Sequence, residues 1–90
     1  MHCYVYKGEK RDDHYLYLSK EIEPDHKPDI PDALLSLLGE LSFVIKFELS
    51  ADRELPQAEA KQVMQDILNQ GYYLQMPKKD MQAVEDILFN

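Results

Sequence analysis

The order of apolar and polar residues predicts short strands and short helices along the chain. Two aromatic runs, His2–Lys7 and His14–Ser19, flank the charged loop Gly8–Asp13, and this pattern is typical of a β-hairpin. Residues 20–30 are acidic, contain proline and show no periodicity, so they are expected to form a loop. The chain therefore begins with two antiparallel strands and a long connection.

Two more strands are predicted further along the chain. Apolar and polar residues alternate over Ser42–Leu49, so one face of this strand is expected to be buried. The residues of that face are Phe43, Ile45, Phe47 and Leu49. A fourth short strand, Tyr72–Met76, is ended by Pro77, which has no backbone N–H to donate to a sheet.

Three helices are predicted between and after these strands. The first, Asp32–Leu38, is rich in leucine and stops at Gly39. The second follows Pro56 and ends near Gly71, a residue suited to a left-handed cap. Its apolar stripe follows the helical repeat and consists of Ala60, Val63, Met64, Ile67 and Leu68. A last helix is predicted at about Asp80–Leu88.

The predicted order is β-β-α-β-α-β-α, which indicates an α+β fold. Four strands and three helices in 90 residues favour a single domain over residues 1–90, built on one four-stranded, largely antiparallel sheet. Three helices are more than one face of so small a sheet needs. We expect two helices on one face and one on the other.

Charge and composition narrow the classes of function. Seventeen acidic and ten basic residues give a net charge of −7, which disfavours nucleic-acid binding driven by phosphate contacts. No apolar run approaches the ~18 residues of a membrane span, and no signal peptide is visible. A single cysteine fits a reducing compartment. We expect a cytoplasmic monomer that does not bind membranes.

The hairpin holds the residues that could carry chemistry. If its loop is Gly8–Asp13, Tyr4 lies opposite Tyr17 and Tyr6 lies opposite Tyr15. The four tyrosines then share one face of the sheet. The opposite face is predicted to be a core face made of Cys3, Val5, Leu16 and Leu18.

The same geometry argues against a reactive cysteine. His14 would lie roughly 13 Å from Cys3 at ~3.3 Å per residue, far beyond the hydrogen-bond reach that a nucleophile and its base require. The histidines lack the spacing of metal ligands and are expected in solvated positions. Phosphate-binding and nucleophile-elbow motifs are absent. We therefore expect no catalytic residue, no metal site and no cofactor.

The tyrosine face is the remaining candidate surface. The leading hypothesis is a non-enzymatic protein-interaction or adaptor module that binds an unknown protein. Its surface would consist of Tyr4, Tyr6, Lys7, Tyr15 and Tyr17, joined by Tyr73 and Gln75 of the fourth strand. An alternative is an RNA-associated factor that stacks bases on the tyrosines and uses the basic residues of the hairpin loop. The last helix could instead cover these rings. An enzyme that depends on Cys3 is the third alternative.

Several segments resemble the YcgL-domain family of small gammaproteobacterial proteins. The pattern M-x-C-x-x-Y-K at the start is followed by Y-L-Y in the second predicted strand. The likeness continues through residues 30–35 with Gly39, through residues 53–55, and most specifically through Gln70–Pro77. The resemblance implies a compact α/β/α sandwich. It supplies no established activity, ligand or catalytic residue. The segment Glu21–Asp29 is longer and more acidic than the usual family link.

Overall fold

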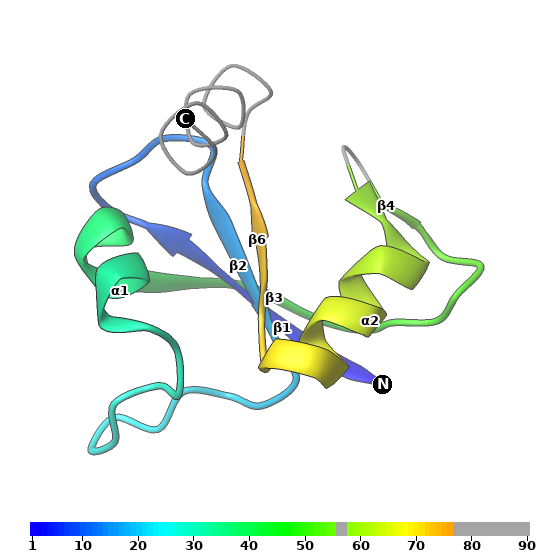
Figure 1. Ribbon diagram of the computed structural model, residues 1–90, viewed down its shortest axis with the longest axis horizontal. Helices are drawn as coiled ribbons and strands as arrows, with labels where there is room; N and C mark the ends of the chain where they lie inside the picture. The colour runs from blue at the N-terminus through cyan, green and yellow to red at the C-terminus, as the bar shows by residue number, and fades with distance from the viewer. Residues whose placement is uncertain (56–57, 77–90) are drawn as a thin grey trace.

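The computed structural model describes residues 1–55 and 58–76. Its elements, in chain order, are β1 (His2–Gly8), β2 (Tyr15–Leu18), α1 (Asp32–Leu38), β3 (Leu41–Glu48), β4 (Glu54–Leu55), β5 (Ala58–Glu59), α2 (Ala60–Gln70) and β6 (Tyr73–Gln75). The main sheet has four strands in the order β3-β1-β2-β6, and all neighbours are antiparallel (Figure 1). The α+β fold with a four-stranded sheet is confirmed. The helix predicted at about residues 80–88 lies outside the described residues.

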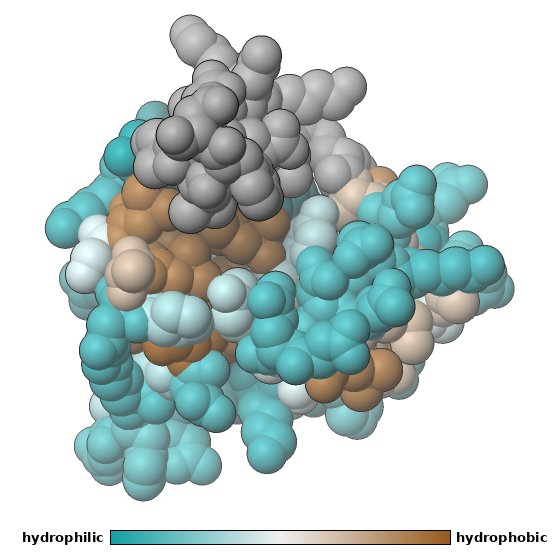
Figure 2. Space-filling model, viewed as in Figure 1, coloured by the Kyte–Doolittle hydropathy of each residue, from teal (hydrophilic) through white to brown (hydrophobic). Residues whose placement is uncertain are grey.

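The two described helices lie on opposite sides of the main sheet (Figure 1). The α1 face of the sheet packs into a cluster made of Tyr6, Leu16, Leu18, Ile30 and Leu38. The α2 face packs into a cluster made of Cys3, Val5, Tyr17, Leu49, Ala60, Val63 and Ile67. Hydrophobic side chains gather beside α1, whereas α2 turns mostly hydrophilic side chains toward the viewer (Figure 2). Both faces of the sheet therefore contribute to the core.

The predicted pairing of the hairpin is wrong by one residue. Tyr4 lies opposite Leu18 and Tyr6 opposite Leu16, so tyrosines do not face tyrosines across the hairpin. Gly8 continues β1 and donates its N–H to the carbonyl of His14 at 3.3 Å, so Gly8 belongs to the strand and not to the loop in which it was predicted. Neighbouring residues of a strand point to opposite faces. The shift of one residue therefore turns each side chain of β2 to the face opposite the predicted one. Tyr4 and Tyr6 lie on the α1 face, and Tyr15 and Tyr17 on the α2 face.

Strand β3 contains a bulge that the sequence did not predict. Val5 lies opposite Ile45, but Tyr6 lies opposite Phe43, so Val44 is the extra residue. The predicted alternation is therefore wrong beyond this point, and Phe43 lies on the α1 face with Tyr6. Phe43, Val44 and Ile45 remain 55%, 48% and 50% exposed. The predicted buried face is confirmed only at Leu49, which is fully buried, and at the half-buried Phe47.

The helices match their predictions more closely. The bounds of α1 agree with the predicted residues, while α2 begins later than Pro56 because β4 and β5 first form a small hairpin. In the apolar stripe of α2, Leu68 is 73% exposed. Gly71 adopts the predicted left-handed conformation with a φ of 93° and donates its N–H to the carbonyl of Ile67. Neither helix of the described ranges is long and apolar enough to cross a membrane.

Candidate functional site

A groove of about 590 Å³ crosses the α2 face of the sheet between β3, β2 and the hairpin of β4 and β5. We call it the α2-face groove. Its apolar walls are Val5, Tyr15, Val44, Ile45, Phe47 and Leu55. No helix of the described ranges fills it, because α2 packs farther along the sheet on Ala60, Val63 and Ile67. The groove is therefore a mostly apolar surface lined mainly by strand residues.

A buried polar pair lies in the wall of this groove. The hydroxyl of Tyr17 donates to Oε1 of Gln75 at 2.6 Å, and both side chains are almost fully buried. Burial raises the pKa of Tyr17 to about 12, with smaller contributions from the neighbouring Cys3, Tyr73 and Tyr15. The hydroxyl therefore stays neutral and serves as a fixed donor. This pair positions the rings around it and is only 6% and 7% exposed at the groove wall.

The structure brings most of the predicted surface together around that pair. The ring of Tyr73 packs edge-on against the ring of Tyr17, with centroids 5.5 Å apart. Burial raises the pKa of Tyr73, and the nearby Asp66 raises it further. Tyr15 lies opposite Gln75 on β6 and opposite Lys7 on β1, and is half-buried. Tyr15, Tyr17, Tyr73 and Gln75 thus form one continuous patch.

Tyr4 and Tyr6 lie on the other side of the sheet. Tyr6 is buried, its hydroxyl accepts the N–H of Ile22 at 2.9 Å, and its ring lies 5.6 Å from that of Phe43. The ammonium of Lys46 lies 5.4 Å from the centroid of the Tyr4 ring, a cation–π contact. The predicted four-tyrosine face is therefore wrong. The hypothesis of RNA binding therefore loses the shared tyrosine face on which bases were expected to stack.

Cys3 is a core residue of the α2 face. Its side chain is fully buried, and this burial raises the pKa of the thiol to about 11, against a small opposing effect of the N-terminal ammonium. Since the thiolate is the nucleophile, this thiol is poorly suited to covalent catalysis at neutral pH.

His14 is not the solvated loop residue expected from the sequence. It is 2% exposed, and its Nδ1 lies 2.8 Å from the carbonyl oxygen of Asp12, so the ring closes the end of the hairpin. Among residues 1–55 and 58–76, no three His, Cys, Asp or Glu side chains are arranged to hold a metal ion.

The rim of the groove carries charged side chains. The guanidinium carbon of Arg53 lies 4.6 Å from the centroid of the Phe47 ring, so this cation covers one aromatic wall. Asp13 and Glu54 add two carboxylates to the lining. Asp13 has a φ of 61°, the left-handed conformation that the short hairpin loop requires.

Sequence reasoning missed several residues of the groove, namely Val44, Ile45 and Leu55. The run of apolar residues at Phe43–Ile45 was a usable signal, because strict alternation fails there. A bulge inserts one extra residue into a strand, so it interrupts the alternation of faces at such a run. No comparable signal marked Leu55.

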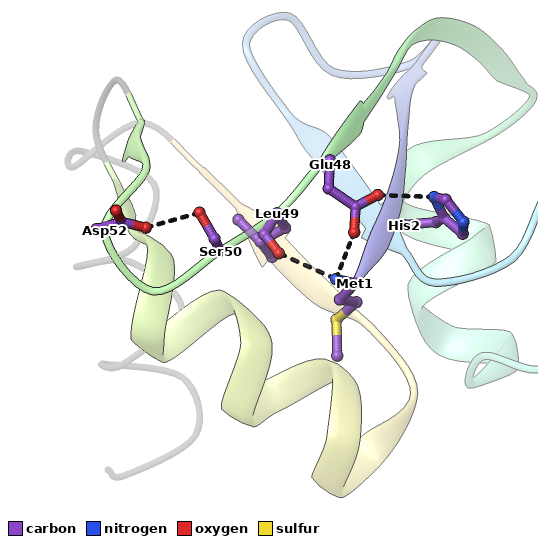
Figure 3. Close-up of polar contacts among 6 residues, drawn as sticks. All are labelled: Met1, His2, Glu48, Leu49, Ser50 and Asp52. Atoms are coloured by element: carbon purple, nitrogen blue, oxygen red, sulfur yellow. Dashed lines mark hydrogen bonds and ion pairs between the residues drawn. The ribbon is translucent and has the colours of Figure 1, made fainter.

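The N-terminal residues form hydrogen bonds and ion pairs with the end of β3 (Figure 3). The Met1 ammonium donates to Glu48 at 2.8 Å and to the carbonyl of Leu49 at 3.1 Å, while Nδ1 of His2 lies 2.8 Å from the other Glu48 oxygen. The hydrogen bond from the ammonium lowers the pKa of Glu48, and His2 lowers it further. Beyond this cluster, Ser50 donates to Asp52 at 2.8 Å. The contacts of Met1 and His2 hold the start of β1 beside the end of β3.

The profile of the YcgL domain matches residues 3–78. This chain belongs to the YcgL domain family. A YcgL domain-containing protein of Mannheimia succiniciproducens is 36% identical over 94% of this chain and 80% of its own length. Another, from Stenotrophomonas maltophilia, is 40% identical over 86% of each chain. The family membership implied by the sequence motifs is confirmed.

A third relative places the same domain in a longer protein. In Nitrosococcus oceani, a protein named as a HAD-like hydrolase is 37% identical over 87% of this chain, but the match takes up only 20% of that protein. The matched segment is therefore accompanied in that protein by a much larger remainder.

Proposed function

We propose that this YcgL domain is a non-enzymatic protein-interaction module that binds its partner through the α2-face groove. The observation that carries the proposal is the mostly apolar groove beside Tyr15 and Tyr17, which no helix of residues 1–55 and 58–76 covers. Exposed concave apolar surfaces with a polar rim are typical of protein-binding sites. Of the residues suggested by the sequence, Tyr15, Tyr17, Tyr73 and Gln75 belong to this surface, and Lys7 lies next to Tyr15.

The chemistry of the groove supports binding over catalysis. Its most buried polar groups, Tyr17 and Gln75, satisfy each other, so neither offers a reactive atom to a substrate. The thiol of Cys3 is buried behind the sheet surface and kept protonated. Aromatic walls with a covering arginine are instead the residue types that dominate binding energy at protein interfaces.

The partner that we propose is a HAD-like hydrolase. In the Nitrosococcus oceani relative, a related segment forms part of a protein with that name. Two domains joined in one chain in one organism can be separate chains in another, and their contact surface is then an interface between proteins. A cytoplasmic location belongs to this proposal and agrees with the single buried thiol.

The proposal is tested by co-purification from the native host with a matched pair of variants. Leu55→Lys places a charge in the groove wall, whereas Leu68→Lys makes the same change on exposed α2. We expect the wild type and Leu68→Lys to capture a HAD-like hydrolase, identified by mass spectrometry. Leu55→Lys should lose at least about tenfold of the bound protein, because burying an unpaired charge is costly. Equal capture by both variants, or capture of no such hydrolase, would contradict the proposal.

A further inference from the structure

We propose that two copies of this chain associate edge to edge through β3, in an antiparallel register centred between Val44 and Ile45. The association does not depend on the hydrolase partner, and its test uses the purified chain alone. It departs from the monomer expected from the sequence, which did not indicate which strand lies at the edge. The structure places β3 at the edge of the sheet.

In the part of the chain that the structure describes, the outer edge of β3 presents backbone groups that no strand pairs with. The N–H of Leu49 donates to the carbonyl of Met1 at 2.7 Å, and the N–H of Glu9 donates to the carbonyl of Glu40 at 2.9 Å, so Leu49 and Glu40 face β1. Backbone direction alternates along a strand and shifts at the bulge. The backbone groups that point outward are therefore those of Leu41, Phe43, Lys46 and Glu48. Within residues 1–55 and 58–76 no strand pairs with this edge.

The middle of this edge carries apolar, exposed side chains. Phe43, Val44 and Ile45 are consecutive and each is about half exposed, at 55%, 48% and 50%. Natural edge strands usually carry charged side chains that prevent pairing with another chain. The two charged side chains of β3 are engaged elsewhere: the Lys46 ammonium lies over the Tyr4 ring on the α1 face, and Glu48 pairs with the Met1 ammonium and His2.

The bulge makes the edge complementary to itself. In a regular strand, a register centred between two residues places side chains of opposite faces against each other. Here Val44 and Ile45 both line the α2-face groove, so the two residues at the centre lie on the same face. A two-fold axis between them therefore pairs Val44 with Ile45 of the second copy on that face.

The rest of the strand follows the same register. Phe43 meets Lys46 of the second copy, and Leu41 meets Glu48, with both pairs on the α1 face. These four residues are also the ones whose backbone groups point outward. One register therefore satisfies both requirements along β3: the outward backbone groups pair with each other, and opposite side chains lie on the same face. An isologous two-fold interface requires both.

The association joins the two α2-face grooves. The two-fold axis stands perpendicular to the sheet, so both α2 faces lie on the same side. Val44 and Ile45 of each copy then form the shared floor where the grooves meet. A joined groove would bind a longer apolar segment than one copy can, which extends the proposed function.

The contact is small and the copies are both acidic, so the association is expected to be weak. Edge-to-edge pairing of one strand falls in the class of interfaces below about 1,200 Å². Two chains of net charge −7 repel each other, and salt screens that repulsion. We therefore expect dimers to form between about 10 μM and about 1 mM and to increase with ionic strength.

Sedimentation velocity over that concentration range tests the association. Wild type and Leu68→Lys should shift from monomer to dimer, whereas Ile45→Lys should weaken the dimer at least tenfold. Leu68 is the matched control because it is an exposed leucine at 73% on a different element. Sedimentation as a monomer throughout, or an equal shift in all three proteins, would overturn the proposal.

Amide hydrogen exchange of the wild type tests the register without any substitution. Raising the concentration should slow exchange at Leu41, Phe43, Lys46 and Glu48, the outward-facing amides. The amides of Ile45 and Phe47, which face β1, should show no comparable change. Protection that appears at other elements, or no concentration dependence at these four amides, would overturn the proposed register.

Discussion

At the scale of single residues, the α2 face depends on one buried polar pair. The hydroxyl of Tyr17 and the amide of Gln75 lie in the apolar lining of the groove and satisfy each other at 2.6 Å. Neither group could be buried there alone without a desolvation cost. The pair therefore fixes β2 against β6 in a single arrangement.

Replacing Tyr17 by phenylalanine should lower the free energy of unfolding by about 1–3 kcal/mol, because Gln75 would lose its buried donor. Urea denaturation measures the change. Tyr15→Phe is the matched control, since Tyr15 is only half-buried, and it should cost less. An equal cost at both positions would show that the Tyr17–Gln75 hydrogen bond is not what stabilises this face.

Cys3 should react slowly with a thiol reagent in the folded protein. Its pKa of about 11, against an ordinary 9.0, leaves roughly a hundredfold less thiolate at neutral pH, and the side chain is also fully buried. Absorbance of the released thiol product should therefore rise only when denaturant unfolds the chain. Rapid reaction in the absence of denaturant would contradict the buried position.

At the scale of elements, two glycines determine how the helices join the sheet. The end of α1 lies against β1 at Gly8, where an added Cβ would fall 2.8 Å from the carbonyl oxygen and 2.9 Å from the Cβ of Leu38. The end of α2 turns at Gly71 with a φ of 93°. The first position requires glycine for space, and the second for backbone conformation.

Gly8→Ala and Gly71→Ala should both lower stability, for different reasons. At Gly8 the methyl group collides with backbone and Cβ atoms that cannot rotate away, and we expect a loss of about 1–3 kcal/mol. At Gly71 the nearest atom is 3.9 Å away, so only the strain of the left-handed conformation remains, about 1–2 kcal/mol.

The two substitutions can be told apart by NMR. Gly8→Ala should move the resonances of Leu38 and its neighbours in α1, whereas Gly71→Ala should leave α1 unchanged. Thermal unfolding of both variants gives the stability change. Stability equal to that of the wild type at Gly8 would show that α1 is free to move away from β1.

At the scale of the whole molecule, the contact between the N-terminus and Glu48 links the first strand to the sheet edge. The Met1 ammonium holds the pKa of Glu48 below its ordinary 4.5. A carboxyl group whose pKa is lower in the folded state stabilises the fold above its unfolded pKa. That stabilisation is lost as the pH falls through the folded pKa.

The stability of the wild type should therefore fall below a pH of about 4.5 more steeply than that of Glu48→Gln. Thermal unfolding between neutral and acidic pH measures both profiles. Repeating the series at about 1 M salt should shrink the difference, since the pair is exposed and such salt screens charges within about 3 Å. Two superimposable profiles at low salt would contradict a role for Glu48.

The sequence by itself determined the fold class, the family, the helix at Asp32–Leu38, the left-handed cap at Gly71 and the approximate positions of the strands of the main sheet. Each of these follows from local patterns, such as periodicity and the placement of glycine and proline, that act within a few residues. The family motifs are equally local.

Only the tertiary structure decided the register of the hairpin, the bulge at Val44 and the position of β3 at the sheet edge. These depend on which strands become neighbours and on whether Gly8 joins the strand or the loop. A shift of one residue leaves the local pattern acceptable but turns every side chain of a strand to the other face. The four tyrosines of the hairpin were therefore divided between two faces by packing, and the groove beside Tyr15 and Tyr17 followed from that division.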